Sequence, residues 1–285
     1  MNILVTFEYP HTWWNTLIVY KNFYDWFEKT YEEHNITYQN TEPHLRHNPS
    51  GIGSPHVMTI RNLDNQKYMI VSYWDRAIEL TWPGNGWDVE HRVDLITSAG
   101  VHFPIDVTPF SYTCYSYEFE KFAQDRRVPW SEKNDNKLFF RGYLYGERKM
   151  MSEYKPELFT ESRKTPIEYF DELNNSKISL SLNGAGEVCN RDMEILCSGS
   201  VLIRPKLEQR FHNDLIPDFH YISVEKIQNP IGQLDAIIKK YEEIKDNSEL
   251  LNTISNNGLD WFNSNGSMLA NVELLKQIIN LDKLN

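Results

Sequence analysis

Apolar runs alternate with amphipathic segments throughout the half of the chain that follows residue 137. The pattern predicts strands at "KLFFRG" (137–142), "KISLSLN" (177–183), "SVLIRP" (200–205) and "HYISV" (220–224), and helices near 146–152, 165–175 and 190–198. Strands that alternate with helices of about ten residues are typical of a parallel sheet with crossover helices. In such a sheet, ligands bind beyond the carboxyl ends of the strands.

The first half also predicts an α/β arrangement. It holds a buried strand at 2–7, a helix at 15–34, a strand pair "VMTIRN" and "KYMIVSYW" (57–62 and 67–74), and a further helix at 89–99. The polar segment 126–137 contains a proline and predicts an interdomain linker. We therefore expect two Rossmann-like domains, 1–130 and 131–285, that face each other across a cleft, with the last helix packed back on the first half.

Composition narrows the class of partner. The 285 residues include 29 basic and 40 acidic side chains, a net charge of −11, whereas a protein that binds polyanions normally shows the opposite balance. Nucleic acid is therefore not an expected partner. No run of about 18 apolar residues predicts a membrane span. Three cysteines make no disulfide framework, and "MNILVTFEYPH" resembles a first strand more than a signal peptide, so we expect a cytoplasmic protein.

The predicted strand–loop–helix–strand segment from 177 to 205 suggests a binding site for a diphosphate. Gly184 and Gly186 lie in the loop after a strand, and Asn190, as the expected N-cap, begins a helix that ends at Gly199. Glycines allow a ligand to approach the backbone, and the amides of a helix N-terminus favour anions.

The charged residues of that helix include Arg191 and Glu194. Arg191, about one turn into the helix, could hold a phosphate through both of its terminal nitrogens. The alternative is that the glycines only shape a turn and that Arg191 pairs with a surface carboxylate.

Two further arginines point to the same edge of the predicted sheet. Arg141 and Gly142 follow the strand at 137–142, and Arg148 comes seven residues after Arg141. Three arginines near one edge of an acidic protein favour an anionic ligand. Alternatively, Arg141 only caps a strand end and Arg148 is a solvated helix residue.

The first half offers a carboxylate at the equivalent edge of its own sheet. Asp75 ends the apolar run "IVSYWD", where it could serve a group-transfer enzyme as the general base that deprotonates an acceptor hydroxyl. Alternatively, Asp75 bonds Arg76 or caps a turn. The competing carboxylates in this half are Glu8, Glu79, Asp88 and Glu90, and Glu8 is the main rival because it also follows a strand.

Three motifs in the second half are similar to those of a known enzyme group. They are "PW…K…FFRG…ER" from Pro129 to Arg148, "NRDMEILCSGSVLI" from Asn190, and "PDFHYISV" from Pro217. Over residues 126–225 the chain resembles glycosyltransferases of the protein O-glucosyltransferase and capsule-associated type, and more distantly the exostosin-like enzymes.

This resemblance implies a GT-B fold and an inverting, metal-independent transfer from a UDP-linked sugar, UDP-glucose or UDP-xylose, to a hydroxyl of a glycan or protein-linked glycan. It implies that Arg191 contacts the donor diphosphate, that Gly142 lies beneath the donor and that Asp75 is the base. The sequence departs from the family at Tyr143 and Leu144, where a further basic residue is often found.

Other chemistries have less support. The chain has no Asp-x-Asp motif, and its nine histidines show no metal-ligand spacing, so no metal or cofactor is expected. Cys189 has no recognisable histidine partner and is better explained as a buried structural thiol. Trp82 and Trp87 lie in a predicted loop and are candidates for stacking on an acceptor sugar.

Two other functions remain as alternatives to a glycosyltransferase. They are a non-catalytic nucleotide- or glycan-binding protein and a nucleotide-sugar epimerase.

Overall fold

The structure is a computed structural model that describes residues 1–8, 17–41, 57–72, 90–97, 108–110, 117–160, 164–184 and 187–285. Contacts divide the chain into two compact units. The first combines Met1–Tyr117, Glu208–Asp214 and Met268–Asn285, and the second combines Glu118–Leu207 and Leu215–Ser267. Each unit is built on its own sheet, so the α/β class is confirmed.

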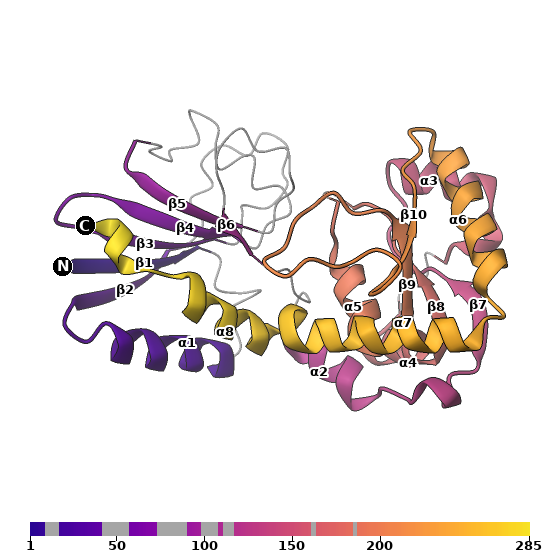
Figure 1. Ribbon diagram of the computed structural model, residues 1–285, viewed down its shortest axis with the longest axis horizontal. Helices are drawn as coiled ribbons and strands as arrows, with labels where there is room; N and C mark the ends of the chain where they lie inside the picture. The colour runs from indigo at the N-terminus through magenta and orange to yellow at the C-terminus, as the bar shows by residue number, and fades with distance from the viewer. Residues whose placement is uncertain are drawn as a thin grey trace. The chain divides into compact units, whose positions relative to one another are not determined.

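The sheet of the first unit has the order β2-β1-β3-β4-β5-β6 (Figure 1). Its strands are β1 (Asn2–Glu8), β2 (Asn35–Thr41), β3 (Val57–Asn62), β4 (Tyr68–Ser72), β5 (Arg92–Thr97) and β6 (Thr108–Pro109). Only β3 is antiparallel to its described neighbours, so β1 and β4 run in the same direction and end at the same edge. The prediction of a helix at 89–99 was wrong, because β5 occupies that stretch and pairs with β4.

Two helices of the first unit pack together although they come from opposite ends of the sequence. They are α1 (Leu17–Thr30) and α8 (Met268–Ile278). Phe23 and Phe27 on α1 are fully buried. The hydroxyl of Tyr31 donates a hydrogen bond to the carbonyl of Ile279 at 3.1 Å. The last helix therefore returns to the first unit, as expected.

The sheet of the second unit is fully parallel, with the order β10-β9-β8-β7. Its strands are β7 (Asp135–Phe139), β8 (Ser176–Leu180), β9 (Val201–Pro205) and β10 (Ile222–Val224). The parallel arrangement with crossover helices, expected from the alternation in the sequence, is confirmed here. All five residues of β9 are buried, as expected for an inner strand covered on both faces.

Helices cover this sheet in two groups. The helices are α2 (Tyr117–Asp125), α3 (Glu147–Tyr154), α4 (Pro166–Asn175), α5 (Asn190–Ser198), α6 (Pro230–Ile244) and α7 (Ser248–Trp261), with short turns η2 (Trp130–Glu132), η3 (Pro156–Leu158) and η4 (Phe262–Gly266). Helix α3 contacts α6, whereas α5 contacts both α4 and α7 (Figure 1). The apolar core fills the space between the strands and α3, α6 and α7.

The ends of α5 follow its sequence closely. Gly199 adopts a left-handed conformation with φ of 66°, which glycine tolerates, and closes the helix as expected. The N-cap lies one residue earlier than expected, at Cys189, so Asn190 is the first helical residue. The backbone N–H of Cys189 donates to the Asp192 carboxylate at 2.7 Å, which fixes this end of the helix.

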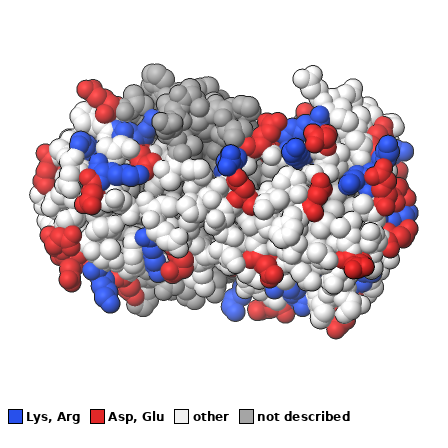
Figure 2. All heavy atoms as spheres, viewed as in Figure 1, with Lys and Arg blue, Asp and Glu red and all other residues white. Residues whose placement is uncertain are grey.

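Charged side chains of both signs are interspersed over the face of the molecule that Figure 2 shows. Among the described residues, no helix is both long and apolar enough to cross a bilayer.

Candidate functional site

A pocket lies at the carboxyl edge of the second unit's sheet. Its cavity volume is about 190 Å³. It is lined by Leu182 and Asn183 after β8, Pro205 at the end of β9, Lys226, Ile227 and Gln228 after β10, Glu147, Arg148 and Met151 on α3, and Gln233 on α6. This is the edge at which parallel α/β sheets bind ligands.

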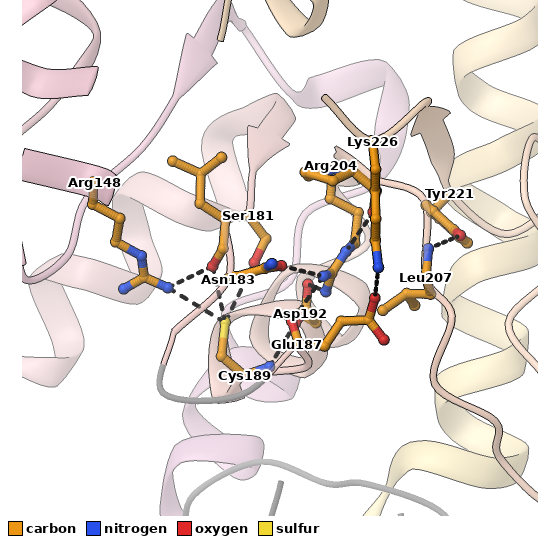
Figure 3. Close-up of polar contacts among 12 residues, drawn as sticks. Arg148, Ser181, Asn183, Glu187, Cys189, Asp192, Arg204, Leu207, Tyr221 and Lys226 are labelled. Carbon is orange, nitrogen blue, oxygen red and sulfur yellow. Dashed lines mark hydrogen bonds and ion pairs between the residues drawn. The ribbon is translucent and has the colours of Figure 1, made fainter. Parts of the chain in front are cut away.

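Arg148 forms one side of the pocket. Its side chain is buried, and Nη2 donates to the carbonyl of Leu182 at 2.5 Å and lies 3.8 Å from Sγ of Cys189 (Figure 3). The guanidinium carbon lies 5.4 Å from the ring centre of Tyr145 and 5.8 Å from that of Phe140. Arg148 is thus not a solvated helix residue, and it secures the loop after β8.

A buried ion pair supports that loop from the other side. Nη1 of Arg204 on β9 lies 2.6 Å from Oδ1 of Asp192 on α5, and neither side chain is exposed (Figure 3). Nη2 of Arg204 also donates to Oδ1 of Asn183 at 3.2 Å and to the carbonyl of Glu187 at 2.8 Å. Burial is the largest single effect and lowers the pKa of Arg204, but Asp192, Cys189 and Glu187 together outweigh it, so the pKa lies above its usual value.

Sequence reasoning missed this ion pair. The signal was Arg204 itself, a single charge inside the apolar strand "SVLIRP", because a charge in a buried strand requires a partner.

Lys226 and Gln233, two further polar residues of the pocket, also have partners. Nζ of Lys226 lies 2.5 Å from Oε1 of Glu187 (Figure 3). The Gln233 amide accepts from the backbone N–H of Ile227 at 2.7 Å and donates to the carbonyl of Glu225 at 3.2 Å, which shapes the loop after β10. The charge of Lys226 is thus paired, whereas Nε of Arg148 is buried and has no hydrogen-bond partner among the described residues.

Arg191 is held differently. Its guanidinium carbon lies 4.7 Å from the ring centre of Phe140 and 5.8 Å from that of Tyr169. Within the described part of the chain, Nη1 of Arg191 is buried and has no hydrogen-bond partner. A Cβ atom at Gly142 would lie 2.7 Å from Nη2, so the glycine leaves the space that this guanidinium occupies.

Glu194 and Tyr169 form a second contact beside Arg191. The Tyr169 hydroxyl donates to Oε2 of Glu194 at 2.6 Å. Burial raises the pKa of Glu194, while the charge of Arg191 acts in the opposite direction. Burial likewise raises the pKa of Tyr169 well above its usual value. Both groups thus belong to the surroundings of the Arg191 guanidinium.

The structure brings two of the three predicted arginines together. Arg148 and Arg191 both face the ring of Phe140. Arg141 instead makes a two-point contact with Glu172 on α4, through Nε at 2.7 Å and Nη2 at 3.0 Å. These contacts match the alternative in which Arg141 serves the strand end, and its role in donor binding stays a prediction.

Gly184 and Cys189 lie close to Arg148. A Cβ atom at Gly184 would be 3.4 Å from Nη2 of Arg148 and 3.3 Å from the hydroxyl of Tyr145, so this position is closely packed. Burial, followed by the charge of Asp192, raises the pKa of the Cys189 thiol. A raised pKa disfavours the thiolate and agrees with a structural role for this cysteine.

Several predicted residues lie outside the described part of the chain. They are Asp75, Trp82, Trp87 and Gly186. Glu8 is the last residue of β1. In the described residues, no group of three or more histidine, cysteine or carboxylate side chains is arranged to hold a metal ion.

Comparison with known proteins assigns no family. The sequence matches no protein-family model, and no curated protein matches it significantly.

Proposed function

We propose that the protein is an inverting, metal-independent glycosyltransferase of the GT-B type. The observation that carries the proposal is the Arg191 guanidinium, which is fixed between aromatic rings and retains a buried N–H without a partner in the described chain. Such an orphan donor calls for a ligand, a water or a catalytic role. Its position after the parallel strands suits a phosphate group.

The proposed reaction uses Arg191 on the leaving group. Negative charge accumulates on the nucleoside diphosphate as the bond to the anomeric carbon of the sugar breaks. A guanidinium that is already in place stabilises this charge without reorganisation. The acceptor oxygen forms the new bond on the opposite face of the sugar, and its proton passes to a base.

The pocket beside Arg148 suits the nucleoside part of the donor. Lys226 is paired with Glu187 and Nη2 of Arg148 is used by the Leu182 carbonyl, so we assign the nucleoside to this pocket and the diphosphate to Arg191. The pocket is lined by amide side chains, such as Asn183 and Gln233, and by apolar ones, such as Leu182 and Ile227. This mixture is appropriate for a neutral base and ribose. Phe140, which both arginines face, links this pocket with Arg191.

The remaining parts of the proposal rest on the sequence resemblance. They are a UDP-glucose or UDP-xylose donor, a hydroxyl of a glycan or protein-linked glycan as acceptor, Asp75 as base, acceptor contacts from Trp82 and Trp87, and a cytoplasmic location.

A panel of nucleotide sugars tests the function. A ligand at about 100 times its dissociation constant stabilises a folded protein by roughly 2.7 kcal/mol, which a thermal shift detects. We expect UDP and one UDP-sugar to raise the melting temperature, and that sugar to release UDP slowly. Tight UDP binding without turnover of any donor would favour the non-catalytic alternative. Conversion of the donor to another UDP-sugar without UDP release would favour the epimerase.

A further inference from the structure

We propose that Tyr169 and Glu194 are positioning residues that hold the Arg191 guanidinium in one orientation for a phosphate oxygen of the ligand. The inference rests on the function proposed above and deepens it, because it assigns a supporting role to residues that do not themselves contact the diphosphate.

The first argument is the geometry around the guanidinium. Its carbon lies 4.7 Å from the Phe140 ring centre and 5.8 Å from that of Tyr169, and Gly142 leaves room for Nη2. Aromatic faces attract a guanidinium and restrict its movement. Phe140 follows β7, Tyr169 lies on α4 and Arg191 lies on α5, so three different elements fix one group.

The second argument is the Tyr169–Glu194 hydrogen bond. Arg191 and Glu194 are three residues apart on α5, a spacing that places their side chains next to each other on a helix. Tyr169 donates to Glu194 at 2.6 Å, and this bond fixes the carboxylate and the ring together. A charged acceptor makes such a bond stronger than one between neutral groups.

The third argument concerns the N–H groups of Arg191 that remain available to a ligand. Phe140 and Tyr169 contact Arg191 through ring faces, which use none of its N–H groups. Among the described residues, Nη1 then stays buried without a partner. A guanidinium that is restrained without using its donors is prepared for an anion, because binding does not first have to order it.

Side-chain NMR of Arg191 tests the restraint without any ligand. In the wild-type protein we expect a slowly exchanging Nε–H signal with hindered rotation about the Nε–Cζ bond. Tyr169→Phe, which keeps the ring but removes the hydroxyl, should speed up the rotation, and Glu194→Gln should do the same. Tyr241→Phe is the matched control, since the Tyr241 hydroxyl donates to the carbonyl of Asn136 at 2.7 Å elsewhere in the unit.

Calorimetry with UDP and with inorganic pyrophosphate tests the consequence. Tyr169→Phe should weaken binding by about 2- to 12-fold, the range for one lost hydrogen bond, but should have no further effect when Arg191 is already alanine. A wild-type protein that shows the restrained signal but binds neither ligand would refute the proposed function and leave the positioning role standing. An unchanged Arg191 signal in both variants, or equal effects of Tyr169→Phe with and without Arg191, would overturn the inference.

Discussion

Arg204 and Asp192 form an ion pair, with 2.6 Å between Nη1 and Oδ1, and neither side chain is exposed to solvent. The contact links β9 to the first turn of α5, and Nη2 of the same guanidinium donates to Asn183 and Glu187 in the loop after β8. Two adjacent parts of the candidate site thus depend on one buried arginine. Removal of one charge leaves the other buried and uncompensated, which makes such pairs sensitive to single substitutions.

Arg204→Met should therefore destabilise the protein by about 3–5 kcal/mol in chemical denaturation. The double variant Arg204→Met with Asp192→Leu should recover part of this loss, because the desolvation cost of both charges disappears. Lys245→Met serves as the control, since the Lys245–Glu242 pair at 2.6 Å lies at the surface, where solvent screening leaves such a pair little effect on stability. Equal losses for Arg204→Met and Lys245→Met would contradict this account.

Gly142→Ala should reduce ligand affinity more than stability. The added methyl group would lie 2.7 Å from Nη2 of Arg191, so it would force this side chain out of its observed position while the backbone stays. We expect UDP affinity to fall by about tenfold or more, as for the loss of one charge-assisted hydrogen bond. Calorimetry with UDP and thermal denaturation separate the two effects.

Gly258→Ala provides the contrast to that variant. There the methyl group would lie 2.6 Å from the backbone carbonyl oxygen of His220, which cannot rotate away. This variant should lose stability, by about 1–3 kcal/mol as for other overpacked sites. Affinity of the remaining folded protein should be unchanged. A Gly142→Ala protein with wild-type UDP affinity would show that Arg191 does not need its observed position.

The regular second unit was predictable because local signals and tertiary packing agree there. The apolar run 177–183 matched β8, and Gly199 matched the left-handed end of α5. The prediction of a helix at 89–99 was wrong, because pairing with β4 and β6 makes residues 92–97 strand β5. Tertiary pairing of this kind overrides local preference.

The candidate site was predictable only in part. Sequence spacing predicted Arg148 and Arg191 near one edge of the sheet, and the structure has both guanidinium groups beside the ring of Phe140. It could not show that Arg141 is engaged by Glu172, because Glu172 lies 31 residues away on α4. Nor could it find the Tyr169–Glu194 bond, which joins two helices and has no motif.

Arg191→Ala should weaken UDP binding and lower turnover by about 10²–10³, the usual effect of removing one electrostatic stabiliser. Arg191→Lys should restore only part of the activity, because lysine keeps the charge but loses the planar fork. Arg126→Ala is a suitable control, as Arg126 pairs with Asp171 at 3.2 Å at the surface of the same unit. Equal UDP affinity in the wild type and Arg191→Ala would refute the assignment.

Lys133 should make stability depend on pH. Burial, with a smaller effect of Arg127, lowers its pKa to about 7, and Nζ donates to the carbonyls of Asn174 at 2.6 Å and Ser198 at 3.1 Å. The unfolded lysine has a pKa of about 10.4, so between these values the unfolded chain binds the additional proton. Stability should then rise with pH across this window and be lost as pH falls through about 7.

Urea denaturation at about pH 7 and about pH 9 checks this expectation, since one proton corresponds to about 1.4 kcal/mol per pH unit at most. Lys133→Met should remove this part of the slope. Lys137→Met, at an exposed position nearby in sequence, should leave the slope unchanged. A slope that persists in Lys133→Met would assign the pH dependence to another group.

The last prediction concerns the base of the proposed transfer. An inverting reaction has no covalent sugar–enzyme intermediate, so one group must take the proton from the acceptor oxygen. Strands β1 and β4 are parallel to each other and end at the same edge of the first sheet, β1 at Glu8 and β4 at Ser72. Glu8 thus ends β1 at that edge, whereas Asp75 lies outside the described residues and stays the base predicted from the sequence.

We expect Asp75→Asn to keep UDP affinity while turnover falls by about 10²–10⁴, the range for a lost general base. Glu8→Gln, measured alongside in the same UDP-release assay, should retain most of its activity. If Glu8→Gln is inactive and Asp75→Asn is not, the base is Glu8. A parallel loss of UDP affinity in Asp75→Asn would indicate instead that this carboxylate acts on donor binding, because a base that acts only on the acceptor contributes nothing to the affinity for UDP.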